Sequence, residues 1–90
     1  MSNRENQPIH ARPAELLQNL IRFDTSNPPG NEADIIAYLH GLFKQSEIAC
    51  TILSKDPGRP NLLVRLPGRG EAPPLLLYAH VDVVPTTNQQ

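Results

Sequence analysis

The chain has 90 residues with 8 Lys and Arg, 9 Asp and Glu, 10 Pro and a single Cys, and its formal net charge at pH 7 is -1. Nucleic acids and anionic membranes are bound by clustered Lys and Arg, so this near-neutral balance argues against both as partners. One cysteine, Cys50, excludes an internal disulfide and a Cys-x-x-Cys metal clip, and it favours a reducing compartment. A chain of this length forms one domain at most.

Neither a secretory signal nor a membrane span is predicted. The first eight residues are polar, and the longest uninterrupted apolar run, residues 75–79, is far shorter than the ~20 residues that cross a bilayer. We therefore expect a soluble, cytoplasmic protein. Residues 1–12 lack hydrophobic periodicity and mix polar side chains with proline, which predicts a disordered tail.

Two amphipathic helices are predicted next, over residues 13–23 and 32–45. In the first, Pro13 suits the first turn and apolar residues recur at helical spacing. In the second, Asn31 is the expected N-cap of a helix with a clear apolar stripe. That stripe comprises Ile35, Ile36, Leu39, Leu42 and Phe43. Between the helices, residues 24–30 are rich in turn-forming side chains and predict a loop.

Three β-strands are predicted over residues 48–53, 61–66 and 75–80, because these runs are rich in β-forming or apolar residues. The connections contain Pro and Gly and are shorter than a parallel crossover requires, so we expect an antiparallel meander. The third run is apolar on both faces, which is typical of a strand covered from both sides. Two helices cannot provide that cover, and we interpret the excess as an indication that further polypeptide completes the fold.

The residues that suggest chemistry stand where the third predicted strand ends. His80 and Asp82 are two positions apart, so in extended backbone their side chains project from the same face. In one interpretation His80 binds a metal ion such as zinc while Asp82 fixes the imidazole tautomer through the other ring nitrogen. In the other, His80 is an ordinary strand-end histidine and Asp82 begins a turn. The spacing alone favours this second interpretation, because His-x-Asp is a weak motif.

Residues 80–85, His-Val-Asp-Val-Val-Pro after an apolar run, resemble the first metal-binding motif of the M20 family of metallopeptidases, the group of amino-acid deacetylases, desuccinylases and carboxypeptidases. Residues 25–32 resemble the loop between the first two helices of that family, and residues 61–68 resemble its second strand. The resemblance covers nearly everything from about residue 13 onward. Ala79 departs from it, because the family often has glycine there.

The resemblance implies an α/β fold in which two N-terminal helices and three strands form the opening part of a zinc-peptidase-like α/β/α catalytic domain, here residues 13–90. It implies that His80 is a ligand of one of two zinc ions, with Co2+ as another divalent ion the site would accept. Asp82 is the implied catalytic-site residue that orients His80. Family members hydrolyse an amide bond in an N-acyl amino acid or short peptide, with metal-activated water and a glutamate base.

The remaining ligands and the glutamate base of the family lie downstream of this motif. We therefore expect the 90-residue chain alone to be inactive and to bind zinc weakly, as the N-terminal part of a longer hydrolase. The family often dimerises through a second domain, so a homodimeric parent is implied. We expect its substrate to be a small molecule or a peptide, and the sequence does not identify which one.

An alternative from another class is a non-enzymatic α/β module that binds a partner chain by strand addition at an open sheet edge. A third is a family member that has lost catalysis and kept binding. Among the other polar residues, Glu32 is interpreted as a complement to the dipole of the second helix, and Arg59 as a solvated loop residue rather than a grip for a substrate carboxylate. Cys50 is expected to be a small buried hydrophobe.

Overall fold

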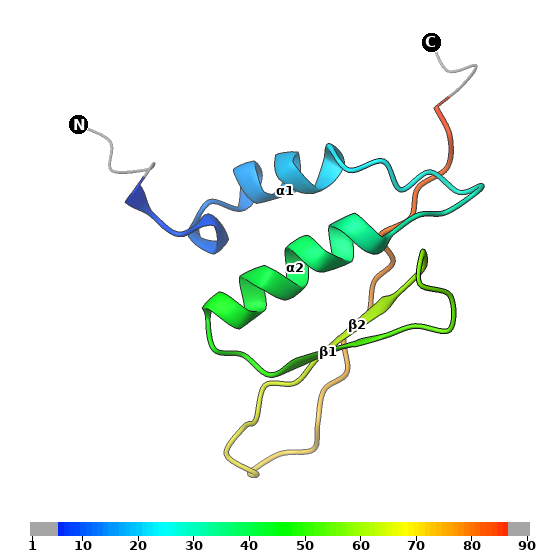
Figure 1. The fold of residues 1–90 in the computed structure, drawn as a ribbon. Coiled ribbons are helices and arrows are strands. Elements are labelled where there is room, and N and C mark those ends of the chain that lie inside the picture. Colours follow the sequence, from blue (N-terminus) through cyan, green and yellow to red (C-terminus); the bar gives the residue numbers. More distant parts are fainter. Residues whose placement is uncertain (1–5, 87–90) are drawn as a thin grey trace.

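A computed structural model describes residues 6–86 of the chain (Figure 1). Residues 1–5 and 87–90 lie outside the described residues, and with them lies the beginning of the predicted tail. The described elements are the 3-10 helix η2 (Ile9–Ala11), the helices α1 (Pro13–Ile21) and α2 (Ala33–Gln45), and the strands β1 (Cys50–Leu53) and β2 (Asn61–Val64). The architecture is therefore mixed α/β, as predicted.

Helix α1 begins at Pro13, as predicted, and ends at Ile21, two residues earlier than expected. Arg12, which precedes it, forms an ion pair with Glu15 in the first turn in place of a side-chain cap. Two contacts join α1 and the residues after it to α2. Asn19 Nδ2 donates a hydrogen bond to the hydroxyl of Tyr38 at 3.1 Å, and the ring of Phe23 packs on that of Tyr38 with centroids 5.4 Å apart.

Helix α2 supplies the apolar core of the described chain. Ile35 and Ile36 are 4% and 5% exposed, and they are the buried hydrophobic residues among those the structure describes. The expected N-cap Asn31 is not used. Glu32 occupies the N-cap position without a side-chain cap hydrogen bond, because its carboxylate is directed elsewhere. Figure 1 shows α2 between α1 and the two strands, and it packs against both β1 and β2.

Strands β1 and β2 form an antiparallel pair, in which Cys50 lies opposite Val64 and Leu53 lies opposite Asn61. This direction was predicted, although both strands are shorter than expected. No helix in the part of the chain that the structure describes is long and apolar enough to span a membrane.

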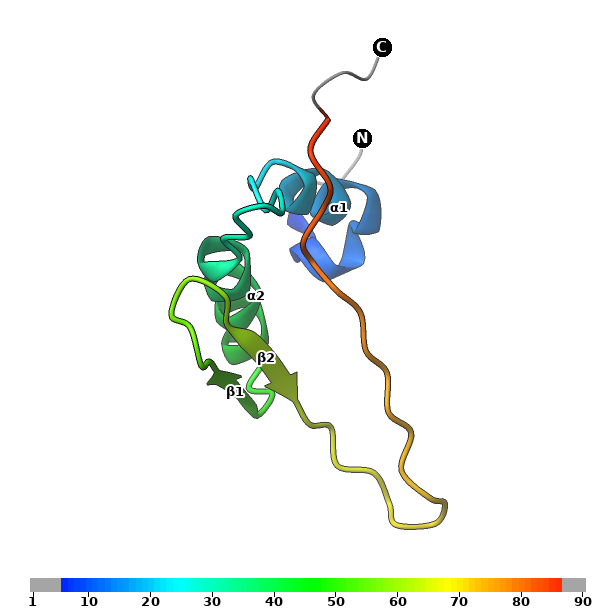
Figure 2. The ribbon, with the colours of Figure 1, turned by 90° about the vertical axis from the view of Figure 1, so that its right-hand side faces the viewer.

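The predicted third strand, residues 75–80, is wrong for the described chain. These residues form no strand, and Figure 2 shows the segment running apart from β2 after a wide turn. That turn, residues 67–74, contains three prolines, which carry the backbone away from the hairpin and donate no hydrogen bonds to it. The apolar side chains that we expected to be covered remain exposed, from 78% at Leu76 to 94% at Tyr78.

Candidate functional site

The backbone around Asp82 is anchored on the loop between the two helices. The amide of Asn27 donates to the carbonyl of Val83 at 2.8 Å, and the amide of Val83 donates to the carbonyl of Thr25 at 3.1 Å, so that the two segments form a short parallel bridge. The Thr25 hydroxyl donates to the carbonyl of Val81 at 2.7 Å, and Thr25 is only 2% exposed. Hydrogen bonds on both sides of Asp82 thus fix its position against the loop.

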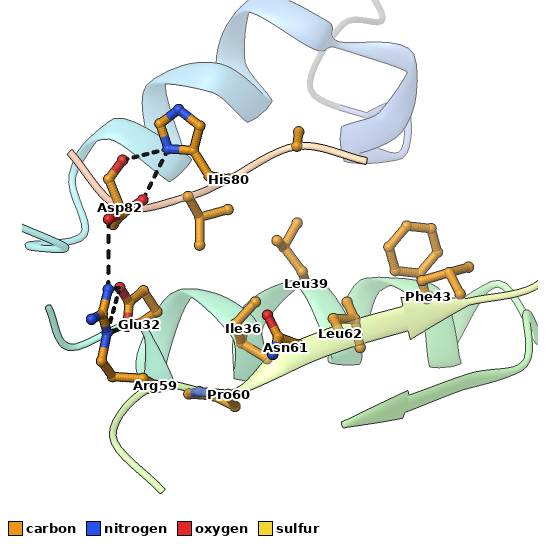
Figure 3. Close-up of a pocket in the computed structure, with 13 residues that line it drawn as sticks. Glu32, Ile36, Leu39, Phe43, Arg59, Pro60, Asn61, Leu62, His80 and Asp82 are labelled. Atoms are coloured by element: carbon orange, nitrogen blue, oxygen red, sulfur yellow. Dashed lines mark hydrogen bonds and ion pairs between the residues drawn. The ribbon is translucent and has the colours of Figure 1, made fainter. Parts of the chain in front are cut away.

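His80 and Asp82 meet, as their spacing predicts. His80 Nδ1 lies 2.9 Å from the Asp82 carbonyl oxygen and 2.9 Å from Asp82 Oδ1. Both oxygens are acceptors, so Nδ1 carries the proton and donates it. In a neutral imidazole this leaves the lone pair on Nε2, and the side chain of His80 is 85% exposed. Figure 3 shows the second ring nitrogen directed away from the carboxylate.

The second oxygen of Asp82 has its own partners. Asn27 Nδ2 donates to Asp82 Oδ2 at 3.0 Å, and Arg59 Nη2 lies 3.6 Å from the same oxygen. The hydrogen bond from Asn27, followed by the hydrogen bond from His80 and the nearby positive charge, lowers the pKa of Asp82, while its partial burial opposes this. Asp82 is therefore a carboxylate at neutral pH, with each oxygen engaged by a different donor.

Arg59 is held in turn by Glu32. The guanidinium donates from Nε to Glu32 Oε2 at 3.2 Å and from Nη2 to Glu32 Oε1 at 2.9 Å, and Glu32 is 5% exposed. These bonds and the charge of Glu32 raise the pKa of Arg59. The backbone supports the pair, because the amide of Glu32 donates to the carbonyl of Gly58 at 2.9 Å.

Gly30 allows the close approach of Arg59 to the loop. It has a φ of +75°, and a Cβ at this position would lie 2.7 Å from the guanidinium carbon. Only glycine adopts that φ without strain and leaves room for the side chain. The loop of residues 24–30 was predicted from its turn-forming residues. The structure shows that Gly30 of this loop also makes room for the guanidinium of Arg59.

Sequence reasoning missed Glu32 and Arg59 as members of this cluster. Glu32 was interpreted through the helix dipole and Arg59 as a solvated residue, but the two form a bidentate ion pair across 27 positions of sequence. No local pattern relates two residues so far apart, because their pairing depends on how the β1–β2 hairpin folds back on α2. Cys50 is half-buried on β1, and its Sγ is 3.9 Å from the carbonyl oxygen of His40, away from this cluster.

The cluster forms one end of a cavity of about 530 Å³. Apolar side chains of α2 and β2, including Ile36, Leu39 and Leu62, line the rest of it (Figure 3). Among residues 6–86, no group of three or more His, Cys, Asp or Glu side chains is arranged to hold a metal ion. Since a catalytic zinc takes about three protein ligands, the described residues fit one imidazole ligand with its orienting carboxylate and not a complete site.

An imidazole whose Nδ1 donates to a carboxylate and whose Nε2 is free is the arrangement found at histidine ligands of metal sites. The chain is similar to proteins named "Probable succinyl-diaminopimelate desuccinylase" from the Staphylococcus aureus strains Mu50, MSSA476 and MRSA252, with 36% identity over 75 residues in each. No protein-family model and no solved structure matches the chain.

The similarity covers 83% of this chain but only 17–18% of each relative, so the chain spans less than a fifth of the length of the curated relatives it matches. The similarity supports a relationship to the M20 peptidase family, which the motifs at residues 25–32, 61–68 and 80–85 resemble. It does not identify a particular member of that family.

Proposed function

We propose that this chain is the N-terminal part of an M20-type dinuclear zinc hydrolase, to which it contributes His80 as a metal ligand and Asp82 as the residue that orients it. The observation that carries the proposal is the 2.9 Å contact between His80 Nδ1 and Asp82 Oδ1, which leaves Nε2 as the ligand atom. A neutral imidazole nitrogen is a preferred zinc ligand, and a carboxylate on its other nitrogen raises its basicity.

The proposed reaction is hydrolysis of an amide bond in an N-acyl amino acid or a short peptide. The names of the relatives favour an N-succinyl amide among these substrates. Bound zinc would polarise the scissile carbonyl and acidify a water molecule. The residues of this chain have the supporting role: Asp82 keeps the Nδ1 proton of His80 in place, and Asn27 donates to Asp82 Oδ2 and thereby lowers the pKa of the carboxyl group.

We further propose that the 90 residues alone bind zinc weakly and hydrolyse no amide. Among residues 6–86, His80 is the one side chain in a ligand arrangement, and zinc in a catalytic site takes about three. The match covers only 18% of the relative. In this proposal, the other ligands and the general base lie in the part of the hydrolase that corresponds to the rest of that length. Co2+ is expected to substitute for zinc because imidazole and carboxylate ligands accept both ions.

The first experiment compares the polypeptide that the gene encodes with its His80→Ala and His10→Ala variants. Metal content is measured after purification, and hydrolysis is measured on N-succinyl and N-acetyl amino acids. We expect His80→Ala to lower metal content and to reduce kcat/KM by at least about 100-fold, because a ligand is lost. His10, an exposed residue of η2, is the matched control and is expected to change neither. A His80→Ala protein with full metal content and activity would contradict the proposal.

The second experiment titrates zinc into the 90-residue chain by calorimetry. Weak binding is expected, because one imidazole cannot complete a zinc site. Tight, stoichiometric binding that disappears in His80→Ala would show that these residues form a site by themselves, and it would overturn the weak-binding part of the proposal.

The alternative function, strand addition by a non-enzymatic module, explains less of the structure. The exposed apolar segment of residues 75–80 is compatible with a partner strand. It is equally compatible with a strand covered by the rest of a catalytic domain. Only the hydrolase proposal also gives a role to the contact between His80 Nδ1 and Asp82 Oδ1, so we favour it.

A further inference from the structure

Asp82 has a charged neighbour, Arg59, which forms an ion pair with Glu32. We propose that Arg59, held by Glu32, is a positioning residue that fixes Oδ2 of Asp82, so that Oδ1 faces His80 Nδ1 and the Nε2 lone pair is presented to a metal ion. This inference rests on the proposed function, because the metal ion is part of it. It adds Arg59 and Glu32, which contact neither metal nor substrate, to the residues on which the site depends.

The first step is the rigidity of Arg59. Its planar guanidinium is bound by both carboxylate oxygens of Glu32, at 2.9 Å and 3.2 Å. The Glu32 side chain is 7% exposed and stands at the beginning of α2, next to the buried core. A fork of donors on a fixed carboxylate has one orientation, unlike a lysine ammonium on a flexible stem. Arg59 therefore presents its Nη2 group to Asp82 from a fixed place.

The second step is that the two carboxylate oxygens of Asp82 have different partners. Oδ1 accepts from His80, whereas Oδ2 accepts from Asn27 at 3.0 Å and faces Arg59 at 3.6 Å (Figure 3). The last distance is that of an ion pair without a hydrogen bond, so Arg59 acts on the carboxylate through its charge. Without this charge, rotation of the carboxylate away from His80 becomes less costly. Nδ1 then keeps only the backbone carbonyl of Asp82 as an acceptor, and the preference of the proton for Nδ1 over Nε2 is weakened.

The third step weighs against the alternative role of Arg59 as a binding group for a substrate carboxylate. Both Nε and Nη2 already donate to Glu32, so one of the two edges by which a guanidinium binds a carboxylate in bidentate fashion is occupied, and Nη2, which the other edge shares, faces Asp82. Releasing it would leave the buried carboxylate of Glu32 without its cation, which is costly. The geometry thus assigns Arg59 to the support of Asp82 rather than to substrate binding.

The test reads the tautomer of His80 directly, in the metal-free polypeptide that the gene encodes. Histidine is labelled with nitrogen-15, and the His80 signals are assigned by their loss in His80→Asn. At a pH where the imidazole is neutral, we expect the proton on Nδ1 in the wild type and a shift toward the Nε2 proton in Arg59→Gln and in Glu32→Gln. Arg59→Lys, which keeps the charge without the fork, is expected to lie between them.

The matched control is Arg69→Gln, the same chemical change at an exposed arginine of the turn before residue 75. Its tautomer is expected to equal that of the wild type. An Arg59→Gln protein that is less stable but keeps the wild-type tautomer would show a purely structural role and overturn the inference. If Arg59→Gln does not fold, Glu32→Gln, which removes the carboxylate that anchors Arg59, decides: a wild-type tautomer and unchanged zinc affinity in that variant would equally overturn it.

A second readout separates this inference from the proposed function. Zinc affinity, measured by competition with a chelator, is expected to fall about 10- to 100-fold in Arg59→Gln, as for other residues that orient metal ligands, and to stay unchanged in Arg69→Gln. Zinc bound through His80 with equal affinity in wild type and Arg59→Gln would overturn the positioning role and leave the function intact. A wild-type protein that binds no zinc would overturn the function, while the tautomer would still decide whether Arg59 acts on His80.

Discussion

Two adjoining segments of the chain differ sharply in how they are packed. Residues 81–83 are bound to the loop between the helices by backbone hydrogen bonds and by the buried hydroxyl of Thr25. Residues 75–78, which lie two residues earlier in the chain, are more apolar, yet they are 78–94% exposed. Apolarity therefore does not decide which segment is anchored. The availability of a hydrogen-bonded neighbour does, because an extended backbone needs partners for its amide and carbonyl groups.

This contrast places the candidate site at a border. On one side lie the residues that are already fixed: Thr25, Asn27, Glu32 and Arg59. On the other side lies an extended segment that ends at His80 and whose apolar side chains are exposed. His80 therefore stands between an anchored segment and an uncovered one.

The sharpest test of the contrast compares two substitutions of similar size. Ile36→Ala, at a residue that is 5% exposed, is expected to lower the free energy of unfolding of the chain by about 2–5 kcal/mol, because it opens a cavity in a small core. Leu76→Ala, at a residue that is 78% exposed, is expected to change it by less than about 0.5 kcal/mol. Urea unfolding measures both. Equal losses in the 90-residue chain would show that the two segments do not differ as described.

The next largest effect is expected at Thr25. Thr25→Val keeps the shape of the side chain but removes the donor to the carbonyl of Val81, so that one of the four hydrogen bonds between the loop and residues 81–83 is lost. A loss of about 1–3 kcal/mol in the free energy of unfolding is expected, the usual cost of leaving a buried group without its partner. Thr51→Val, on the exposed face of β1, is the control and should be close to neutral. A neutral Thr25→Val would mean that the bridge is held by its backbone alone.

The sequence predicted the helices well because their signals are local. Pro13 in a first turn and the stripe that contains Ile35 and Ile36 each lie within one element, and the structure places both helices within two residues of the expected bounds. The contact between His80 and Asp82 was predictable for the same reason, since alternation along extended backbone brings positions i and i+2 together.

The failures have a common physical cause, which is that the information is not local. A strand exists only with a neighbour, so the composition of residues 75–80 could not decide whether a strand forms in this chain. The ion pair of Glu32 with Arg59 depends on the folding of the hairpin onto α2, and no sequence pattern around either residue indicates its partner. The roles of His80 and Asp82 at a metal ion remain predictions that the experiments above decide.

A smaller effect is expected from glycine substitutions that test the close approach of Gly30 to the Arg59 guanidinium. Gly30 and Gly70 both have a φ of +75°, so alanine at either is expected to cost about 1–2 kcal/mol through the strained backbone. Only at Gly30 does the added Cβ also meet the guanidinium, at 2.7 Å, whereas at Gly70 it enters open space. Gly30→Ala should therefore destabilise the chain more than Gly70→Ala in urea unfolding. Equal losses would indicate that Arg59 moves aside without strain and would weaken its assignment as a rigid support.

The smallest effect, and the one of opposite sign, is expected at Gly41 in α2. A Cβ built there meets nothing within 4 Å, so Gly41→Ala should raise the free energy of unfolding of the 90-residue chain by about 0.5–1 kcal/mol through helix propensity alone. The same substitution in the polypeptide that the gene encodes separates two cases by thermal unfolding. An equal gain means that this face of α2 stays open to solvent. A loss there, set against a gain in the 90-residue chain, means that other polypeptide packs on α2, and the border between fixed and uncovered surface then extends beyond the segment that carries His80.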